Sequence, residues 1–360
     1  MTSRTAAVLS FLALLTAAPV AAQQAPAYTP DEAKLYEAAK AEGTVVWYVG
    51  GPLDGMNAIA AEFQKTYPGI KVETLRLVGV AQYQRFLDET NAKKYLADVL
   101  QSTDYPSMVS LVDLGHIAQW KLPTFDKIPE RYRIKDYAYA QYTSTNAIVY
   151  NVNKVTPEEV KLLESGWEAV LDPRFKGRFS VSSMKCGVCY APVHMFMDPK
   201  FKDRYGPEFL RKVVAQQPAV YAEVLVTLDR VVAGEQDFTM WGWESAAAIK
   251  QLEGAPIRWI FPKPTPDFGN SWQGISKYSR HPNAARLFLN WTMSEKGALA
   301  MERIYGGYST LQGIPDVRTY AQEKWYAQPK EIYPVDWERW GANYHKDMDE
   351  WAAIIKKGRN

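Results

Sequence analysis

Hydrophobic residues along the chain follow two spacings, which alternate through the first hundred positions. In some segments they recur three or four residues apart, which is typical of an amphipathic helix; in others, β-branched and aromatic runs are typical of strands. Gly50-Gly51-Pro52 and Pro68-Gly69 break the pattern between such segments. Strands that alternate with helices predict a parallel sheet with helical crossovers. The expected helices are residues 30–41, 53–67 and 81–93, and the expected strands are residues 44–49, 70–77 and 97–100.

The middle of the chain carries a longer extended pattern. Residues 137–151 are rich in tyrosine, threonine and β-branched residues, which predicts one long strand, or two strands joined at Asn146. A proline-rich linker at 262–266 then precedes an amphipathic helix at 283–300. Two αβ units joined in this way predict an α/β fold of two lobes with a cleft between them. The other expected elements are helices at 156–171, 189–197 and 207–215 and strands at 177–182 and 258–261.

Composition and charge narrow the class of protein. The 360 residues are long enough for two or three domains, and 47% hydrophobic with 23% charged residues indicate a globular chain. The formal net charge is only +2, so the basic surplus that a nucleic-acid partner requires is missing. Aromatic residues are abundant (12 Trp, 22 Tyr and 13 Phe), enough to pack cores and to line a ligand cleft. We expect no nucleic-acid partner, and a monomer.

Residues 1–22 have the order of a secretory signal peptide. An arginine near the start is followed by an apolar run at 6–18, and Val20 and Ala22 are small enough for cleavage before Gln23. The alternative is an N-terminal anchor that stays attached, although the run is short for a membrane span. No later segment is long and apolar enough to cross a bilayer, so we expect an exported, soluble protein.

Candidate ligand-binding residues lie where the expected strands end, because ligands of open parallel sheets lie beyond the carboxyl ends of the strands. Gly50 and Gly51 follow the first strand and precede a helix, so their backbone N–H groups suit a carboxylate, phosphonate or sulfonate; an ordinary strand–helix turn is the alternative. Ser102 and Thr103 follow the third strand. Their hydroxyls suit hydrogen bonds to a ligand or, alternatively, the cap of the next helix.

A tryptophan-rich segment supplies the next candidates. Trp241 and Trp243 flank Gly242, so in an extended segment both side chains face the same way and suit a clamp on a flat or apolar group. Packing beneath the hinge is the alternative. Glu244 follows, and together with the tryptophans it would alternatively suit a cation. Trp272, beyond the proline linker, lies either at the cleft or over a lobe.

The two cysteines, Cys186 and Cys189, form a C-x-x-C pair next to Lys185 and Tyr190, which we expect within reach of the ligand. A single pair lacks the four ligands of a structural zinc site. In an exported protein we expect a disulfide, while a redox dithiol and capture of a metal or metalloid stay open. The histidines are scattered and no G-x-S-x-G motif occurs, so we expect no metal site, no cofactor and no catalytic residue.

Five segments in a fixed order carry a family resemblance. They are Glu42–Tyr48, Phe63–Val72, Ala97–Leu100, Ile148–Asn151 and Arg280–Ala285. Over about residues 30–315 the chain resembles the periplasmic solute-binding components of bacterial ABC importers, in the branch that includes ferric-ion binders. The resemblance implies a type II periplasmic-binding-protein fold, with a mixed sheet flanked by helices in each lobe, and closure on a solute without chemistry. It also implies a periplasmic location and a membrane-embedded ABC permease as partner.

The resemblance also implies a division of the chain and a ligand. The expected division is 28–142 and 270–320 for lobe 1, 143–269 for lobe 2, and 321–360 for a C-terminal helical segment packed on the lobes. Ferric-ion binders of this branch use adjacent tyrosines where this chain has Trp241 and Trp243, and tryptophan cannot ligate a metal. We expect a small organic solute, anionic or zwitterionic with a flat or apolar part. The alternatives are a ferric ion, a cationic solute, or an exported thiol–disulfide protein that uses Cys186 and Cys189.

Overall fold

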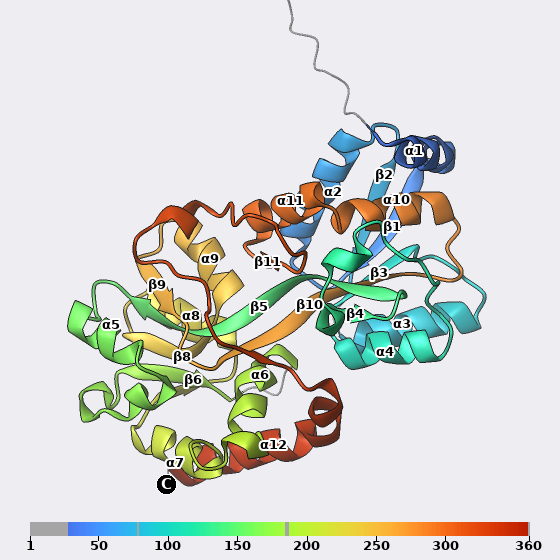
Figure 1. Cartoon of the computed structure of the whole chain (residues 1–360). Helices are drawn as coiled ribbons and strands as arrows, with labels where there is room; N and C mark the ends of the chain where they lie inside the picture. Colours follow the sequence, from blue (N-terminus) through green and yellow to red (C-terminus); the bar gives the residue numbers. More distant parts are fainter. Residues whose placement is uncertain (1–27, 78, 184–186, 359–360) are drawn as a thin grey trace, which may run out of the picture.

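The computed structural model describes residues 28–77, 79–183 and 187–358, with only the backbone at 187–189 and 268–270. Twelve strands of this part of the chain join one hydrogen-bonded network, whose main path is β2-β1-β3-β10-β5-β8-β6-β7. Helices flank each half of the network, which gives the two-lobed α/β architecture that we predicted (Figure 1). The signal-peptide prediction at 1–22 lies outside the described residues. None of the described helices has the length and apolar character that crossing a membrane requires.

Lobe 1 is built on a parallel sheet, as the alternating pattern predicts. β1 pairs in parallel with β2 and β3, in the register Trp47↔Thr74 and Trp47↔Val99. α10 begins where the carboxylate of Glu42 accepts hydrogen bonds from the backbone of Asn283. The lobe consists of α1 (Pro30–Glu42), β1 (Thr44–Val49), α2 (Leu53–Thr66), β2 (Lys71–Arg76), α3 (Val80–Asn91), β3 (Val99–Ser102), α4 (Tyr105–Asp113), β4 (Arg133–Ile134), α10 (Pro282–Thr292), α11 (Glu295–Tyr305) and β11 (Tyr308–Ser309).

Two long antiparallel strands, β5 (Ala138–Asn151) and β10 (Thr265–Ile275), connect the lobes. The first half of β5 pairs with β10, and its second half pairs with β8 and β9 of lobe 2. β10 in turn pairs with β3 of lobe 1 and with the short β12 (Ile332–Pro334). All 14 residues of β5 are buried, so the chain covers this crossing along its whole length.

Lobe 2 has a second sheet region in which β6 runs parallel to β7 and β8. Its elements are α5 (Pro157–Leu163), β6 (Phe179–Ser182), α6 (Gly187–Phe196), α7 (Pro207–Ala215), β7 (Ala219–Tyr221), α8 (Val224–Val232), β8 (Phe238–Trp243), α9 (Glu244–Leu252) and β9 (Ile257–Ile260). Short 3₁₀ helices in the described chain span Phe125–Lys127, Glu130–Tyr132, Trp167–Leu171, Pro173–Phe175, Pro199–Phe201 and Thr319–Gln322.

Each lobe has its own aromatic-rich core. In lobe 1 the ring centroid of Trp47 lies 4.9 Å from that of Phe288, which joins β1 to α10. In lobe 2 Phe179 and Phe238 stack at 5.1 Å between adjacent strands. Aromatic pairs of this kind contribute roughly 0.5–1.5 kcal/mol beyond their burial. The two cores meet at the crossing strands, and the residue boundaries that we gave for the lobes stay a prediction.

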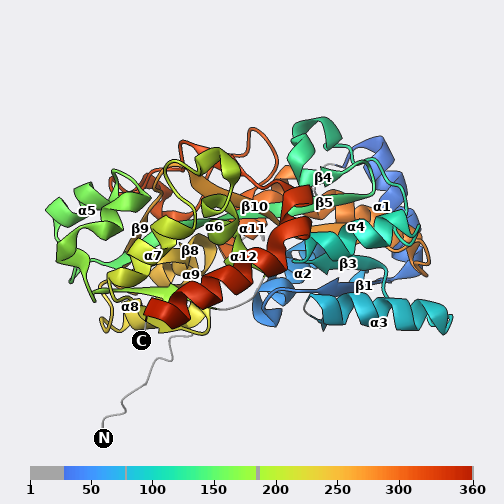
Figure 2. The same cartoon turned by 90° about the horizontal axis from the view of Figure 1, so that it is seen from below.

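The C-terminal segment ends in the 22-residue helix α12 (Trp337–Gly358), whose buried face packs on α6 and α7. Figure 2 shows α12, in red, crossing the molecule from beside α4 to the far end of lobe 2. Trp340 and Trp351 are buried in this contact. The helix therefore reaches from one lobe to the other.

Two expected helices are wrong in extent, for identifiable reasons. The helix predicted at 283–300 is two helices, because Ser294 caps the start of α11 and Gly297 lies against the carbonyl of Trp291. A Cβ at position 297 would stand only 2.1 Å from that oxygen. The helix predicted at 156–171 stops at Leu163, since Gly166 has a φ of 149°.

Candidate functional site

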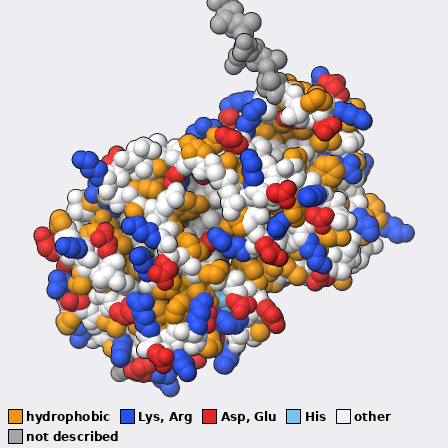
Figure 3. Space-filling model, viewed as in Figure 1, with side chains coloured by type: hydrophobic (Ala, Val, Ile, Leu, Met, Phe, Trp, Pro, Cys, Tyr) orange, Lys and Arg blue, Asp and Glu red, His pale blue; other side chains and the backbone are white. Residues whose placement is uncertain are grey.

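Four strands are each followed by a helix. β1 and β3 of lobe 1 are followed closely by α2 and α4, β8 of lobe 2 runs straight into α9, and α6 is the next described helix after β6. Ligands of open α/β sheets lie at such carboxyl ends, and most of the candidate residues fall here. The face of the molecule in Figure 3 mixes basic and acidic side chains over both lobes, with no large patch of one sign.

The glycine turn after β1 is packed against its neighbours. The N–H of Gly50 donates to Oε1 of Gln101 at 2.6 Å, so this donor is already used within the protein. The carbonyl of Gly51 accepts a hydrogen bond from Nε of Arg76 at 2.9 Å. A Cβ at position 51 would lie 2.7 Å from the terminal methyl of Met56 and 3.0 Å from the hydroxyl of Tyr305, so a side chain here would displace the ends of these two residues. Of the two N–H groups that we expected to face an anion, that of Gly50 is therefore already occupied.

Arg76, the last residue of β2, is a cation at this turn that our sequence analysis missed. Its side chain is exposed, and none of the ion pairs among the described residues includes it. Tyr305 links the turn to the crossing strand, since its ring lies 5.2 Å from that of Tyr142. Burial raises the pKa of Tyr305, and the positive charge of Arg76 opposes this shift. The sequence signal for Arg76 was its position, because it lies next to the end of the strand predicted at 70–77.

The hydroxyl residues after β3 divide into one buried and one half-buried side chain. Ser102 is buried, and its Oγ accepts the N–H of Asp104 at 3.1 Å. Thr103 is half-buried and lies against Gly50, with its methyl 3.4 Å from the position of a Cβ there. The carboxylate of Asp104 accepts a hydrogen bond from Ser107 in the first turn of α4, which orients this charge toward the helix.

Trp241 and Trp243 differ in exposure. Trp241 is 2% exposed and packs 5.3 Å from the ring of Trp351 in α12. Trp243 is half-buried at the edge of the same core, and its Nε1 is a buried donor without a partner among the described residues. Trp241 is therefore packed in the core of lobe 2, whereas Trp243, the last residue of β8, lies partly exposed at the edge of that core.

Glu244 lies in a buried charge network. Both Glu244 and Arg318 have fully buried side chains, and Nη1 of Arg318 donates to Oε1 of Glu244 at 2.8 Å. Asp316 binds the same guanidinium at 2.6 Å, and Arg318 also lies 3.7 Å from the ring centroid of Tyr308. Burial raises the pKa of Glu244 to about 7 despite the positive charge of Arg318. This carboxylate is neutralised within the protein.

Trp272 and Tyr190 are both fully buried. Trp272 lies 4.7 Å from the ring of Tyr105, the first residue of α4. The hydroxyl of Tyr190 donates to Asp347 of α12 at 2.6 Å. Lys185 and Cys186 lie outside the described residues, as does the side chain of Cys189, so the expected disulfide stays a prediction.

The crossing strand contributes buried polar atoms that have no partner among the described residues. They are Nε2 of Gln141, Oγ1 of Thr145 and Oδ1 of Asn146, from side chains that are at most 2% exposed. Asn146 is in register with Trp243, so an unused acceptor and an unused donor lie on neighbouring strands. Buried polar groups usually have partners, so unused ones along β5 suit contacts to a ligand or to internal water.

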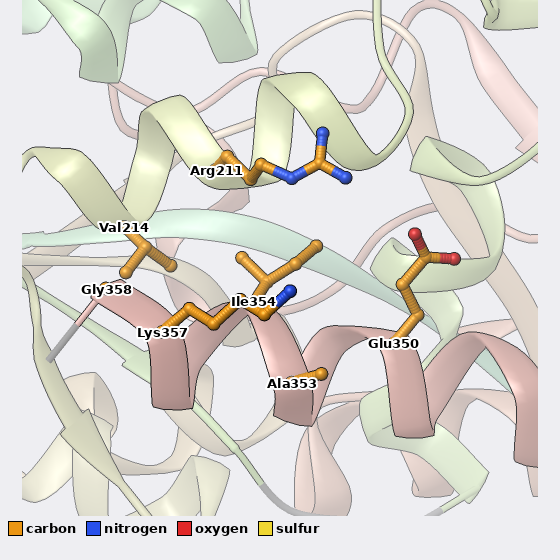
Figure 4. Close-up of a pocket in the computed structure, with 7 residues that line it drawn as sticks. All are labelled: Arg211, Val214, Glu350, Ala353, Ile354, Lys357 and Gly358. Atoms are coloured by element: carbon orange, nitrogen blue, oxygen red, sulfur yellow. The ribbon is translucent and has the colours of Figure 1, made fainter. Parts of the chain in front are cut away.

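Two hollows lie elsewhere. One of about 300 Å³ lies between α7 and α12, where Figure 4 shows Arg211, Glu350 and Lys357 around Ile354. Another of about 460 Å³ lies against β1 and β2, next to Arg280 and His281. Neither lies at the carboxyl ends of the strands. The described residues contain no group of three or more His, Cys, Asp or Glu side chains that could hold a metal ion.

Comparison with known proteins agrees with this architecture. The family model of bacterial extracellular solute-binding proteins matches residues 50–299, and the chain belongs to this family. An uncharacterised protein of Haemophilus influenzae is 22% identical over 272 residues, covering 72% of this chain and 76% of that protein. This chain is therefore a solute-binding protein of the ABC-transporter class, a family of extracellular or periplasmic, non-enzymatic transport components.

Two solved structures share the fold at low sequence identity. Iron-bound HitA from Pseudomonas aeruginosa has a TM-score of 0.64 and 19% identity, covering 88% of this chain and 98% of that one. AfuA from Actinobacillus pleuropneumoniae, with fructose-6-phosphate bound, has a TM-score of 0.63 and 18% identity, covering 88% and 99%. The two are solved with very different ligands, so the fold alone does not select the solute.

Proposed function

We propose that this protein captures a small organic anion or zwitterion between its lobes and delivers it to a membrane-embedded ABC permease. One observation carries the proposal: the turn after β1 has an exposed cation without an acidic partner, Arg76, whereas the carboxylate at the end of β8, Glu244, is neutralised by Arg318. This balance of charge favours an anionic group over a cation. The half-exposed ring of Trp243 and the unused acceptor of Asn146 suit the remainder of the solute.

Ferric ion is the less favoured ligand. Hard metal ions require several oxygen or nitrogen donors, and the described residues contain no group of three or more His, Cys, Asp or Glu side chains that could supply them. At the place where ferric binders of this branch carry adjacent tyrosines, β8 carries Trp241 and Trp243. AfuA, with a sugar phosphate bound, is an example of an organic anion on this fold.

The test uses the mature protein in a thermal-shift screen against carboxylates, phosphorylated sugars, amino acids, amines and ferric ion. A solute at about 100 times its Kd should add roughly 2.7 kcal/mol to the stability. For a hit, Arg76→Gln should weaken binding about 10- to 100-fold, because the variant loses a charge-assisted hydrogen bond. Arg303→Gln is the matched control, since Arg303 is an exposed arginine on α11 of the same lobe.

The alternatives have distinct outcomes in the same screen. A coloured complex with ferric ion and no response to organic anions would overturn the proposal. Stabilisation by amines alone would identify a cationic solute. A thiol–disulfide protein would instead reduce insulin disulfides, and this activity would be lost in Cys186→Ser.

A further inference from the structure

Helix α12 is firmly part of lobe 2. Its Trp351 donates from Nε1 to the carbonyl of Ser182 at 3.0 Å, at the end of β6. Asp347 accepts from the hydroxyl of Tyr190, and Trp340 lies 4.6 Å from the ring of Tyr190. These buried polar and aromatic contacts fix the helix on α6 and β6.

The first residue of α12 reaches the other lobe. The ring of Trp337 stacks on Tyr105 of α4, with centroids 4.3 Å apart and an interplanar angle of 21°. It also meets Trp272 of β10 edge-on, at 6.1 Å. Trp337 packs against the hydrophobic cores of both lobes. On the lobe 2 side its ring lies 5.3 Å from that of Trp340, so an unbroken row of aromatic rings runs from α4 to α6.

This row crosses between the lobes next to the candidate site. Tyr105 stands three residues after Ser102, the last residue of β3. The crossing strand β5 is buried at every position, and Gly306 of lobe 1 lies against Ala248 of lobe 2, with 3.1 Å between a Cβ at 306 and that of Ala248. The lobes are therefore in close contact here, and the aromatic row joins them from a second side.

We propose that Trp337 is a latch that holds the lobes together in the orientation seen in Figures 1 and 2 before any solute binds. Separation of the lobes must break the stack of Trp337 on Tyr105, because α12 moves with lobe 2 and α4 moves with lobe 1. Trp337 is thus a positioning residue: it raises the fraction of molecules that are competent to bind, which raises the apparent affinity for a solute. The inference depends on the proposed function in one respect, which is that the solute binds between the lobes.

The experiment measures the distance between lobes without a solute. Spin labels attached to p-acetylphenylalanine at Lys94 of lobe 1 and Lys161 of lobe 2, both exposed, leave the cysteines untouched. Wild-type protein should give one short distance. Trp337→Ala should increase the population at longer distances about 10-fold or more, the effect of losing two ring contacts. Trp337→Phe should restore most of the short distance.

A second variant tests the same contact from lobe 1. Tyr105→Ala should give the same long distances as Trp337→Ala, and the double variant should add little, because both remove one contact. Trp325→Ala is the matched control, since Trp325 packs 4.9 Å from Trp259 within one lobe. Unchanged distances in both Trp337→Ala and Tyr105→Ala would overturn the latch. Because no solute is present, this result is independent of the solute screen.

Discussion

The guanidinium of Arg318 donates to the carboxylate of Glu244 at 2.8 Å, and neither side chain is exposed to solvent. Arg318 comes from the segment that follows α11, and Glu244 is the first residue of α9. The pair therefore fixes the segment that follows α11 on lobe 2, at the end of β8. Removal of charges from water is costly, so such a pair is most sensitive to loss of one partner.

Arg318→Met should destabilise the protein by about 3–5 kcal/mol, because Glu244 and Asp316 then lose their shared counter-charge. Urea unfolding followed by tryptophan fluorescence measures the change. Arg303→Met, on the exposed side of α11, should stay within about 0.5 kcal/mol. Equal stability of the two variants would show that the buried pair does not matter.

Glu244 should also make the stability depend on pH. Its pKa is raised from 4.5 to about 7 by burial. Between these values the folded protein keeps a proton that the unfolded chain has released, so stability should fall as the pH rises, by up to about 1.4 kcal/mol per pH unit. Glu244→Gln should flatten the profile in this window. A wild-type profile without a decline there would contradict the raised pKa.

His194 should give the opposite slope. Burial, together with the charge of Arg339, lowers the pKa of His194 from 6.5 to about 3. Below pH 6.5 the unfolded chain binds a proton that the folded protein does not, so stability should decrease as the pH falls toward 3. His194→Gln should remove this contribution in acid. Unfolding curves of the variant and the wild type between pH 4 and 7 check this prediction. The pH-dependent part of the difference in their free energies of unfolding should become smaller toward neutral pH.

Asp98 holds the start of α10. Its carboxylate accepts hydrogen bonds from the backbone of Val46, Arg280 and His281 and from the side chains of Ser279 and His281. Asp98→Asn should cost about 2–4 kcal/mol, because an amide cannot accept all of them. Glu42→Gln, a half-buried cap of the same helix, should cost only about 1 kcal/mol. Thermal unfolding compares the two, and a reversed order would disprove the role of Asp98.

Substitution of Trp241 should mainly affect stability, whereas substitution of Trp243 should mainly affect the binding of a solute. Trp241→Phe should lower stability by about 1–3 kcal/mol, because it leaves space next to Trp351 in the core. Trp243→Phe should change stability little, but should weaken any solute found in the screen, since its Nε1 is unused by the described residues. Titrations of both variants with that solute provide the check. Equal affinity losses would favour the clamp of two tryptophans that we expected from the sequence.

The two-lobed architecture could be predicted because the hydrophobic spacing within each segment predicts the helices and strands that build the lobes. Helical spacing and β-branched runs marked α2 and β1 directly, and glycine or proline marked their ends. The break at Ser294 could not be predicted from periodicity, because the apolar spacing of α10 continues into α11. Only the close packing of Gly297 on Trp291 explains it.

The candidate site was harder to predict than the fold. The ends of β1 and β3 meet, because Thr103 lies against Gly50, but position after a strand could not reveal that Gln101 uses the N–H of Gly50. The partner of Glu244 lies 74 residues further along the chain, and such a distant contact leaves no local signal. Our sequence analysis missed Arg76 because an arginine at the end of a strand is common. Its hydrogen bond to the carbonyl of Gly51, which distinguishes it, is visible only in the structure.

The discontinuous core of lobe 1 has a consequence for the order of folding. That core combines residues between Ala39 and Tyr142 with residues between Trp272 and Leu311. During synthesis, lobe 1 cannot be completed until all of lobe 2 has left the ribosome, because Trp272 and α10 come later in the chain. Lobe 1 of the nascent chain therefore stays incomplete until α10 and α11 have been synthesised, whereas the core of lobe 2 does not depend on these helices.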